Sequence, residues 1–411
     1  MLVTRTAKIL QSICEIPAAD WNRCANPACV TFDPFVTHEF LSALEESGSA
    51  TGRTGWQPFH LIVEEDGEQI GVMPMYVKNH SQGEYVFDYS WADAWQRSGQ
   101  DYYPKLQVSV PFTPATGRRV LVAQPDPETE QTLLGACVQV SEQIDVSSVH
   151  MTFMPESQWQ AAGKLGFLQR MDQQYHWHNA GYATFDDFLA DLSSKKRKNL
   201  KRERRDALAH DLEIEWLTGS DITESHWDAF YRFYLDTGAR KWGSPYLTRE
   251  FFSLISERLA DHTLLIMCKR SGTYIAGALN FIGGDTLFGR NWGCLEHHPF
   301  LHFEICYYQA IDFAIDRGLK KVEAGAQGSH KVARGYLPQA TYSAHWISDP
   351  GLRRAVDQFL DEERRYVQQD IDYVERNTPF KQSIDLQGIR ELSLGEASSQ
   401  SKSQFKSQSD V

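Results

Sequence analysis

The sequence predicts a mixed α+β protein of two tandem domains, each with a mainly antiparallel central sheet flanked by helices. The length of 411 residues suggests two or three domains at ~150 residues per domain. Two segments, His60–Trp91 and Thr263–Trp292, share one pattern: apolar strand, glycine-containing charged turn, second apolar strand, second turn, and a third strand ending in tryptophan. This pattern is typical of a three-stranded antiparallel meander. The domains are predicted at 1–178 and 179–392; two unrelated α+β domains that agree by coincidence are the alternative.

The first half should continue with a helix and a strand after its meander. Helical spacing of apolar residues predicts a helix over Glu130–Ile144, and a short strand is expected at Ser148–Met154. Between the meander and this helix, Phe87–Arg119 is too long and too aromatic for a simple turn. Long ordered segments of this kind often carry function.

The second half is expected to begin with a long helix near Tyr182. Thr184 fits an N-cap with Asp187 in the first turn. The helix carries a sparse apolar stripe, which consists of Phe188, Leu189, Leu192, Leu200 and Leu208. The remaining expected elements are a strand at Leu212–Leu217, helices at Glu224–Thr237 and Thr248–Ala260, a helix at His302–Asp316, a strand at Leu319–Ala324 and a helix at Pro350–Glu375. The Ser/Gln-rich tail 393–411 is predicted to be disordered.

Charge is concentrated in one segment of an otherwise acidic chain. Residues Lys195–Arg205 hold eight Lys and Arg against one Glu, a net +7, so the other 400 residues carry −20 within the total of −13. This distribution excludes a general nucleic-acid binder, which would have a broad basic face. It predicts a protein that grips phosphate at one place. Within this segment, Lys198 and Arg202 are the expected phosphate or nucleic-acid contacts; a solvated face and a membrane-surface helix are the alternatives.

The composition points to a globular cytoplasmic protein. Hydrophobic residues make up 42% and aromatic residues 12% of the chain, which excludes a disordered protein. No apolar run approaches the ~18 residues of a membrane span, and the first residues lack the pattern of a signal peptide. The seven cysteines are scattered without a CxxC pair, so reduced thiols and no metal site are expected.

The densest candidate site is the loop Gly325–Pro338, which follows a strand and contains three glycines. Glycines let a backbone approach a ligand closely. His330 could act as a general base near neutral pH, and Lys331 and Arg334 could hold phosphate or carboxylate. An ordinary surface loop with basic residues is the alternative.

A second group of candidates surrounds the helix start after the second meander. His302 and Glu304 are expected to face a cleft, with capping or support of other residues as the alternative. Pro299 marks the first turn, where free N–H groups form an anion cradle. Glu323, in an otherwise apolar strand, is either paired with a nearby cation or a general base. Arg290 and Trp292 end the third meander strand beside the same cleft, unless they serve cross-strand packing.

The first half offers polar and aromatic candidates in its long segment. Tyr103, Lys105 and Arg118, together with Tyr102 and Thr113, could line a pocket between the halves. An aromatic packing surface between domains is the alternative.

Four strings make the sequence similar to a known family: FDYSWADAW, YYPKLQVSVPFTPATGRR, GRNWGCLEHHPFLHFEICYYQAI and GAQGSHKVARGYLP. They resemble the bacterial predicted N-acyltransferases, which are GNAT-like and related to the Fem-type peptidoglycan aminoacyl transferases. The resemblance covers about Ser12 to Arg376. It implies two tandem GNAT-like domains, in which a splayed pair of central strands holds the acyl donor and a helix start meets its pyrophosphate.

The resemblance places that donor site at the end of Leu287–Trp292 and at Pro299–Glu304. The acetyl-CoA signature [Q/R]-x-x-G-x-[G/A] is matched only in part by Arg290–Leu295. In Fem-type enzymes the donor is an aminoacyl-tRNA and the acceptor is an amine on a cell-wall precursor. The basic helix resembles the segment that opens their second domain, and Lys331 resembles a lysine near substrate phosphate.

The expected function is therefore N-acyl transfer from acyl-CoA or aminoacyl-tRNA, as a co-substrate, to an amine acceptor. No covalently bound cofactor is expected. Glu323 or His330 would take the amine proton, with His302 or Glu304 as alternatives. A GNAT-like protein that binds a phosphorylated cell-wall precursor or RNA without catalysis is the competing function.

Overall fold

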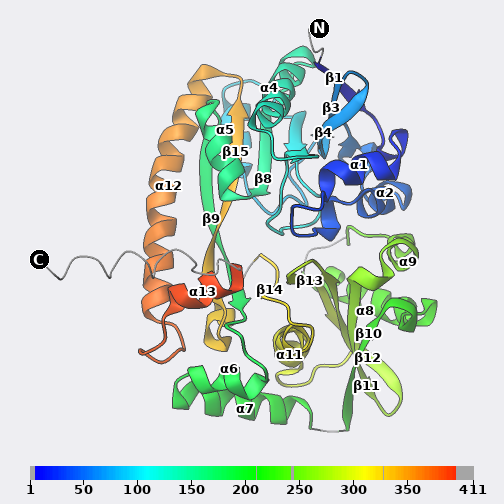
Figure 1. Cartoon of the computed structure of the whole chain (residues 1–411), viewed down its shortest axis with the longest axis vertical. Coiled ribbons are helices and arrows are strands. Elements are labelled where there is room, and N and C mark those ends of the chain that lie inside the picture. Colours follow the sequence, from blue (N-terminus) through cyan, green and yellow to red (C-terminus); the bar gives the residue numbers. More distant parts are fainter. Residues whose placement is uncertain (1–4, 210, 242–244, 327, 395–411) are drawn as a thin grey trace, which may run out of the picture.

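The computed structural model of the chain describes residues 5–209, 211–241, 245–326 and 328–394. It has a mixed α+β fold in which helices flank two sheets, as the sequence predicts (Figure 1). The smaller sheet has the strand order β1-β3-β4-β7 and is antiparallel throughout. Its strands are β1 (Arg5–Leu10), β3 (His60–Glu65), β4 (Glu68–Met73) and β7 (Leu121–Val122).

The larger sheet has eleven strands in the order β10-β11-β12-β13-β14-β9-β15-β8-β6-β5-β2. From one edge to the other these are β10 (Leu212–Thr218), β11 (Thr263–Arg270), β12 (Thr273–Ile282), β13 (Thr286–Cys294), β14 (Lys321–Glu323), β9 (Leu168–His178), β15 (Leu337–Ile347), β8 (Ser148–Met154), β6 (Lys105–Val108), β5 (Met75–Lys78) and β2 (Trp56–Pro58). Two neighbouring pairs are parallel, one in each half of the chain: β13 with β14, and β6 with β8.

The two halves exchange strands at the centre of this sheet. Strand β9 of the first half pairs with β14 of the second half, while β15 of the second half pairs with β8 of the first. β9 and β15 also pair with each other over nine residues, from Leu337↔His176 to His345↔Leu168. The sheet is therefore continuous across the predicted domain boundary at residue 178. The boundary itself stays a prediction.

Helices cover the sheets on both sides. α12 (Pro350–Arg376) runs along β9 and β15, and α8 (Glu224–Lys241) lies over β12 and β13 in the lower half of the molecule (Figure 1). α9 (Arg249–Arg258) packs against α8 and against α2 of the first half. The other helices are α1 (Ala18–Ala25), α2 (His38–Glu46), α3 (Tyr89–Arg97), α4 (Pro127–Gln143), α5 (Glu156–Lys164), α6 (Phe185–Asp191), α7 (Ser194–Ala207), α10 (Leu301–Phe303), α11 (Gln309–Asp316) and α13 (Leu386–Leu394). Among the described residues, no helix has the length and apolar composition needed to span a membrane.

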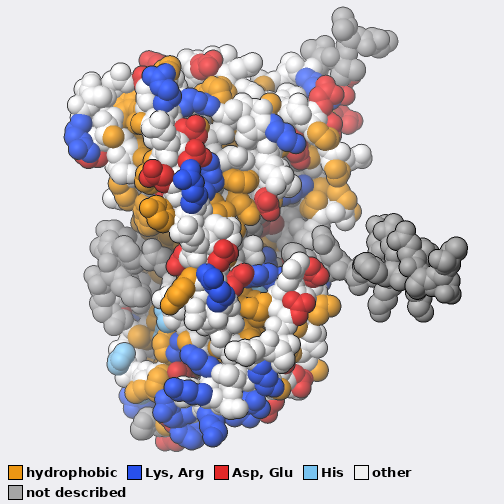
Figure 2. Space-filling model, turned by 90° about the vertical axis from the view of Figure 1, so that its left-hand side faces the viewer, with side chains coloured by type: hydrophobic (Ala, Val, Ile, Leu, Met, Phe, Trp, Pro, Cys, Tyr) orange, Lys and Arg blue, Asp and Glu red, His pale blue; other side chains and the backbone are white. Residues whose placement is uncertain are grey.

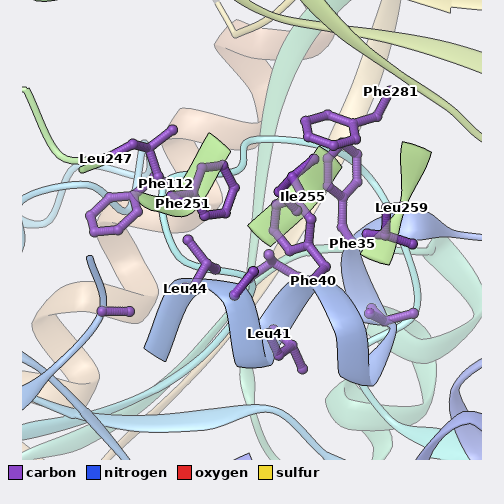
Figure 3. Close-up of a cluster of buried hydrophobic side chains, with 14 of the residues drawn as sticks. Phe35, Phe40, Leu41, Leu44, Phe112, Leu247, Phe251, Ile255, Leu259 and Phe281 are labelled. Carbon is purple, nitrogen blue, oxygen red and sulfur yellow. The ribbon is translucent and has the colours of Figure 1, made fainter. Parts of the chain in front are cut away.

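The largest buried cluster joins the two halves. Phe35 and Phe40, from the first half, pack edge-on against Phe281 of β12 with ring centroids 5.3 and 5.4 Å apart (Figure 3). Phe40 also contacts Phe251 of α9 at 5.7 Å. Such aromatic pairs contribute beyond the area they bury, so the halves share one hydrophobic core.

The second predicted meander is confirmed, and the first is wrong in its last strand. β11, β12 and β13 pair antiparallel in order, whereas β5 leaves β4 for the larger sheet. The expected third strand up to Trp91 is a loop followed by α3. The cause is the buried Lys105, whose ammonium binds both Glu84 and Asp88 and holds this segment away from strand pairing.

The predicted long helix after Thr184 is two helices, α6 and α7. The Thr184 capping box is present. Leu192 then adopts extended backbone angles (φ −80°, ψ 151°) and forms a β-bridge with Phe380, which ends α6. Leu208, expected on the apolar stripe, is 40% exposed after the end of α7. Of the predicted tail 393–411, residues 393 and 394 end α13, and 395–411 lie outside the described residues.

Candidate functional site

Strands β13 and β14 part after three paired residues. Their parallel register runs from Thr286↔Lys321 to Phe288↔Glu323, where β14 ends, while β13 continues to Cys294. On its other edge β13 pairs with β12 through a bulge, because Asn280 faces Gly289 and Leu279 faces Asn291. Arg290 is the extra residue of this bulge. A bulge bends a strand and redirects its side chains, so β13 diverges from the line of β14.

A cavity of about 430 Å³ lies at this divergence. It is lined by strand residues Ala278, Leu279, Asn280, Gly289, Arg290, Asn291 and Trp292, by helix residues His302, Cys306 and Tyr307, and by Ala324, Gly328 and His330 after β14. A second cavity of about 310 Å³ adjoins it and shares Trp292 and His302. Both cavities belong to the second half of the chain.

The helical wall of the cavity is a π-helical turn, Glu304–Tyr308, between α10 and α11. Such turns are rare and occur often at functional sites. Glu304 is fully buried, and its carboxylate accepts from Arg204 of α7 at 2.9 Å and from Gln309 at 2.8 Å. Arg204 also binds Asp312 of α11 at 2.6 Å. These contacts fix the turn against α7 and leave His302, Cys306 and Tyr307 on the cavity side.

The loop wall consists of the residues after β14, ending in a 3₁₀ turn over Ser329–Arg334. Gly328 has φ +121°, and a Cβ there would lie 2.5 Å from the His330 ring, so glycine allows the ring to fold back over the loop. His330 Nε2 lies 2.8 Å from Tyr307 Oη. Burial raises the pKa of Tyr307, which keeps the phenol neutral.

The candidate bases predicted from sequence fall into two groups. His302 and His330 line the cavity, with ring centroids 6.3 Å apart. Glu304 belongs to the buried ion pair with Arg204. Glu323 is 3% exposed, 3.0 Å from Lys321 and 3.8 Å from His176. Of the two interpretations given for Glu323, the geometry favours pairing with a cation.

Of the candidate phosphate ligands in the second half, some line a cavity and others bind groups of the protein itself. Trp292 lines both cavities, and Arg290 lines the larger one while donating to the Phe112 carbonyl at 2.6 Å. Lys331 is 1% exposed and donates to the Gly325 carbonyl at 2.7 Å. Arg334 binds Glu203 at 2.9 Å.

Lys198 and Arg202 are exposed on α7, near the π-helical turn. Figure 2 shows Lys and Arg side chains gathered at the lower end of the molecule, where Figure 1 places α6 and α7.

In the first half, the predicted pocket residues divide between a cavity and the interior. Arg118 lines a cavity of about 260 Å³ together with Phe288 and Lys321 of the second half. Lys105 is fully buried and donates to Ser81 and Glu84 at 2.8 Å each, and Tyr103 Oη bonds to the same Ser81 hydroxyl. Arg118 donates to the carbonyls of Cys24 and Ala25 at 2.7 and 2.9 Å. The two further residues named with them are also buried: Tyr102 donates to Asp88, and Thr113 to the Pro111 carbonyl.

In the parallel pair of the first half, buried side chains form hydrogen bonds around Thr152. Gln107 of β6 donates to Thr152 Oγ1 of β8 at 3.1 Å. Arg119 is 1% exposed and donates to the Thr152 carbonyl at 2.9 Å and to the Ala115 carbonyl at 2.7 Å.

Sequence reasoning missed Asn280, Cys306 and Tyr307 as cavity residues. Cys306 follows His302 by four residues, which is the spacing of one helix face, so the helical prediction contained a usable signal for it. Asn280 carries no such signal, because the bulge that brings it to Gly289 depends on the pairing of β12 with β13.

Comparison with solved structures shows which proteins share this fold. The crystal structure of FemX matches with a TM-score of 0.52 and 12% identity, covering 85% of this chain and all of FemX. The C-terminal domain of a putative lysylphosphatidylglycerol synthetase from Agrobacterium fabrum matches with a TM-score of 0.53 and 8% identity, covering 82% of this chain and 95% of that one. A tandem GNAT protein from the clavulanic acid biosynthesis pathway matches with a TM-score of 0.47 and 9% identity, covering 84% and 99%. The predicted fold class, a mixed α+β protein with mainly antiparallel sheets flanked by helices, is confirmed, and the fold is similar to that of FemX.

Comparison with sequences gives the family. No curated protein sequence matches the chain significantly. A sequence model of the FemAB-like family, described by peptidoglycan biosynthesis and recognition, matches residues 12–382. Because this match covers most of the chain, and the fold agrees with that of FemX, the chain belongs to the FemAB-like family.

Proposed function

We propose that the protein is an N-acyltransferase that moves an acyl or aminoacyl group from acyl-CoA or aminoacyl-tRNA to an amine, with a cell-wall precursor as the acceptor class. The observation that carries this proposal is the cavity where β13 diverges from β14. Beyond Phe288, some backbone N–H groups of β13 point away from β12. These groups can bind the carbonyl oxygen of an acyl donor in the cavity. Donors placed in this way stabilise the negative charge that develops on that oxygen during acyl transfer.

The acceptor amine must lose a proton, and His330 is suited to take it. When Nε2–H donates to Tyr307 Oη, Nδ1 is the proton acceptor of the imidazole. His302, also in the cavity, is a second imidazole within reach of the same space. Positioning of donor and acceptor in one cavity supplies a further part of the rate.

The basic face of α7 supports a donor that carries phosphates. α7 contacts both the π-helical turn and the 3₁₀ turn that holds His330. Its exposed Lys198 and Arg202 therefore lie on an element that adjoins the cavity walls. A polyanion such as tRNA gains affinity from such a cluster through counterion release.

Turnover assays test this function. Full-length protein is incubated with acetyl-CoA, longer acyl-CoA thioesters or aminoacyl-tRNA, together with lysine-containing peptides or an amine-bearing cell-wall precursor. We expect an amide product, and His330→Gln should lower kcat by about 100-fold or more. The matched control is His226→Gln at the start of α8, which should keep the wild-type rate.

The outcomes separate the two candidate functions. Wild-type activity in His330→Gln would remove His330 from the mechanism. Binding of a phosphorylated precursor or RNA without amide formation under any donor would identify a non-catalytic binding protein instead.

A further inference from the structure

Three large aromatic side chains form an exposed row along α12. Phe359, Tyr366 and Tyr373 are 44%, 70% and 62% exposed. Seven residues separate each ring from the next, so successive rings differ in direction by only about 20° around the helix and stand about 10.5 Å apart along it. Single exposed apolar residues are ordinary on a protein surface, whereas a regular row of them indicates a binding surface.

The aromatic row is connected to a second pair of exposed rings in the first half. Glu363, which lies between the first two rings of the row, binds Arg170 of β9 at 2.7 Å. The same guanidinium donates to the Phe87 carbonyl at 2.8 Å. Phe87 and Tyr89 are 49% and 50% exposed, and their rings stack with centroids 5.9 Å apart. Figure 2 views the side of the molecule on which α12 lies in Figure 1, and hydrophobic side chains border its charged ones there.

A polar cavity of about 260 Å³ joins this surface to the candidate site. Phe87 forms part of its wall, together with Asp172 and Gln173 of β9 and with Gly328 from the loop after β14. Gly328 also lines the larger cavity that contains His330. A long ligand that lies on the exposed rings can therefore place one end beside the groups proposed for acyl transfer.

The charges beside the aromatic row are mainly acidic. On a helix, residues three and four positions apart are neighbours, and the charged neighbours of the three rings are Glu362, Glu363, Asp370 and Arg376. Glu363 is neutralised by Arg170, whereas Glu362 and Asp370 are exposed. Asp172, in the polar cavity, is exposed as well. A ligand that matches this surface combines positive charge with flat apolar faces.

Amino sugars have this combination. The faces of a pyranose ring carry C–H groups that pack on aromatic rings, and its hydroxyl groups form hydrogen bonds with carboxylates and amides. Its protonated amine is attracted by carboxylates and by aromatic faces. In an extended β-1,4-linked chain, the repeat of two sugars is close to the interval between the rings of the row, so every second sugar can stack on one ring.

We propose that the acceptor is a β-1,4-linked chain of amino sugars, which binds along the aromatic row of α12 and presents an amine at the cavity of His330. This inference rests on the proposed function and names its acceptor class. In the transfer, the sugar nitrogen forms a bond to the acyl carbon, and the carbon–sulfur or carbon–oxygen bond of the donor breaks. The proton that the nitrogen loses passes to His330 and from there to the departing thiolate or alkoxide.

Calorimetric titration of the full-length protein with a glucosamine hexamer tests the surface without any acyl donor. We expect binding, and Tyr366→Ala combined with Tyr373→Ala should weaken it about 10-fold or more. Tyr366→Trp keeps a ring for stacking and should retain the affinity. Leu165→Ala, at an exposed residue after α5, is the control and should leave binding unchanged. Equal affinities of the wild type and the double tyrosine variant would overturn the proposal.

Further titrations separate sugar recognition from charge. Cellohexaose has the same linkage without amines and should bind about 10-fold or more weakly than the glucosamine hexamer. Any binding of hexalysine, which has amines without sugars, should be insensitive to the tyrosine changes. Cellohexaose binding as tight as that of the glucosamine hexamer would contradict the role of the amines. An equal loss of hexalysine binding in the tyrosine variant would contradict the recognition of sugar rings.

The carboxylates beside the row have a matched control on the same helix. Glu362→Gln with Asp370→Asn should weaken binding of the glucosamine hexamer, because two charges next to the rings are removed. Asp357→Asn with Asp361→Asn makes the same change of net charge at two exposed residues on the opposite side of α12, and it should leave the affinity unchanged. Equal losses in the two variants would contradict binding along the row.

Turnover links the surface to catalysis. With acetyl-CoA or an aminoacyl-tRNA as donor, the glucosamine hexamer should be N-acylated. The double tyrosine variant should raise KM for the hexamer about 10-fold, while kcat and the KM for free glucosamine stay unchanged, since one sugar does not reach the row. A fall in kcat without a change in KM would contradict a role in binding the acceptor.

The failures of the two proposals can be told apart. If amide forms on a lysine-containing peptide and on no amino sugar, the acceptor class is wrong and the transferase function stands. If no donor gives amide but the hexamer binds in a tyrosine-dependent way, the transferase function fails and the sugar-binding surface stands. If sedimentation shows a dimer that Tyr366→Ala dissociates, the row is a contact between two copies of the chain and the proposal is overturned.

Discussion

The charged residues around the cavity divide into those that hold the fold together and those that face the substrate space. Arg204, Glu304 and Asp312 form one buried network between α7, the π-helical turn and α11. His302 and His330 face the cavity. Substitution of a residue in the buried network should lower the free energy of unfolding. Substitution of His302 or His330 should instead lower the turnover rate.

Arg204→Met should strongly destabilise the protein. Glu304 is fully buried, and removing its partner leaves an uncompensated charge, which costs about 3 kcal/mol or more. The adjacent Arg205→Met is the control, since Arg205 pairs with its own neighbour Asp206 at the surface, and its loss should change the free energy of unfolding by about 0.5 kcal/mol or less. Urea denaturation measures both; equal effects would contradict the structural role of Arg204.

The buried amine of Lys331 should make stability depend on pH. Its pKa is about 8 in the folded protein and near its usual 10.5 when unfolded. Between these values the folded state has lost the proton and the unfolded state still binds it, so stability rises with pH. From pH 7 to 9.5, the wild type should gain about 2 kcal/mol relative to Lys331→Met. Urea denaturation at both pH values checks this; a constant difference would show that the amine is solvated.

At the scale of elements, β13 sets the shape of the site through its close approach to α8. A Cβ at Gly293 would lie 2.2 Å from the backbone oxygen of Phe233. Backbone atoms cannot rotate away as a flexible side chain does, so only glycine allows this distance. The same strand carries the bulge at Arg290, and its far end lines both cavities.

Gly293→Ala should therefore cost about 1 to 3 kcal/mol, because α8 must move away from β13. Gly135→Ala is the matched control: this glycine lies in α4 with nothing within 4 Å of the added Cβ. Alanine there should stabilise the protein by about 0.5 to 1 kcal/mol, since it favours the helix. Thermal or urea unfolding distinguishes the two, and a neutral Gly293→Ala would contradict the close packing.

The basic helix α7 should govern the affinity for tRNA. The double change Lys198→Glu with Arg202→Glu should weaken binding and lower the slope of log K against log salt concentration by about 2. The control variant makes an equal change of net charge away from α7: Arg97→Glu with Lys164→Glu, two exposed residues of the first half. Filter binding between 50 and 200 mM salt measures the slopes; equal losses would assign the effect to net charge alone.

For the whole molecule, the exchange of β9 and β15 ties the halves into one folding unit. Each half completes its sheet with a strand of the other, and Phe35, Phe40, Phe251 and Phe281 form a shared core (Figure 3). Two independent domains would unfold separately, whereas a shared sheet and core make the transition common to both.

Unfolding in urea should accordingly show one transition. Circular dichroism and tryptophan fluorescence should superimpose, and a core change in either half should lower the same midpoint. Leu61→Ala in β3 and Phe281→Ala in β12, both buried, serve as the two probes, with expected costs of about 2 to 5 kcal/mol each. Two separated transitions, each shifted by only one of the variants, would contradict the coupling.

The accuracy of the sequence predictions follows the range of the interactions involved. The meander β11–β13 and the Thr184 cap depend on neighbours a few residues away, and both are confirmed. The strand expected before Trp91 failed because its fate depends on Lys105, which lies beyond the segment in sequence. His330 was predicted from the composition of its loop, and it does line the cavity.

The sequence by itself determined the class of the fold and the loop that carries His330, since these arise from local periodicity, turn residues and composition. Only the tertiary structure decided that Glu304 binds Arg204, one hundred positions away, and that Glu323 lies beside Lys321. It also decided that Cys306 faces the cavity. Which charge meets which partner depends on strand pairing and helix packing across the whole chain, and one-dimensional patterns do not contain that information.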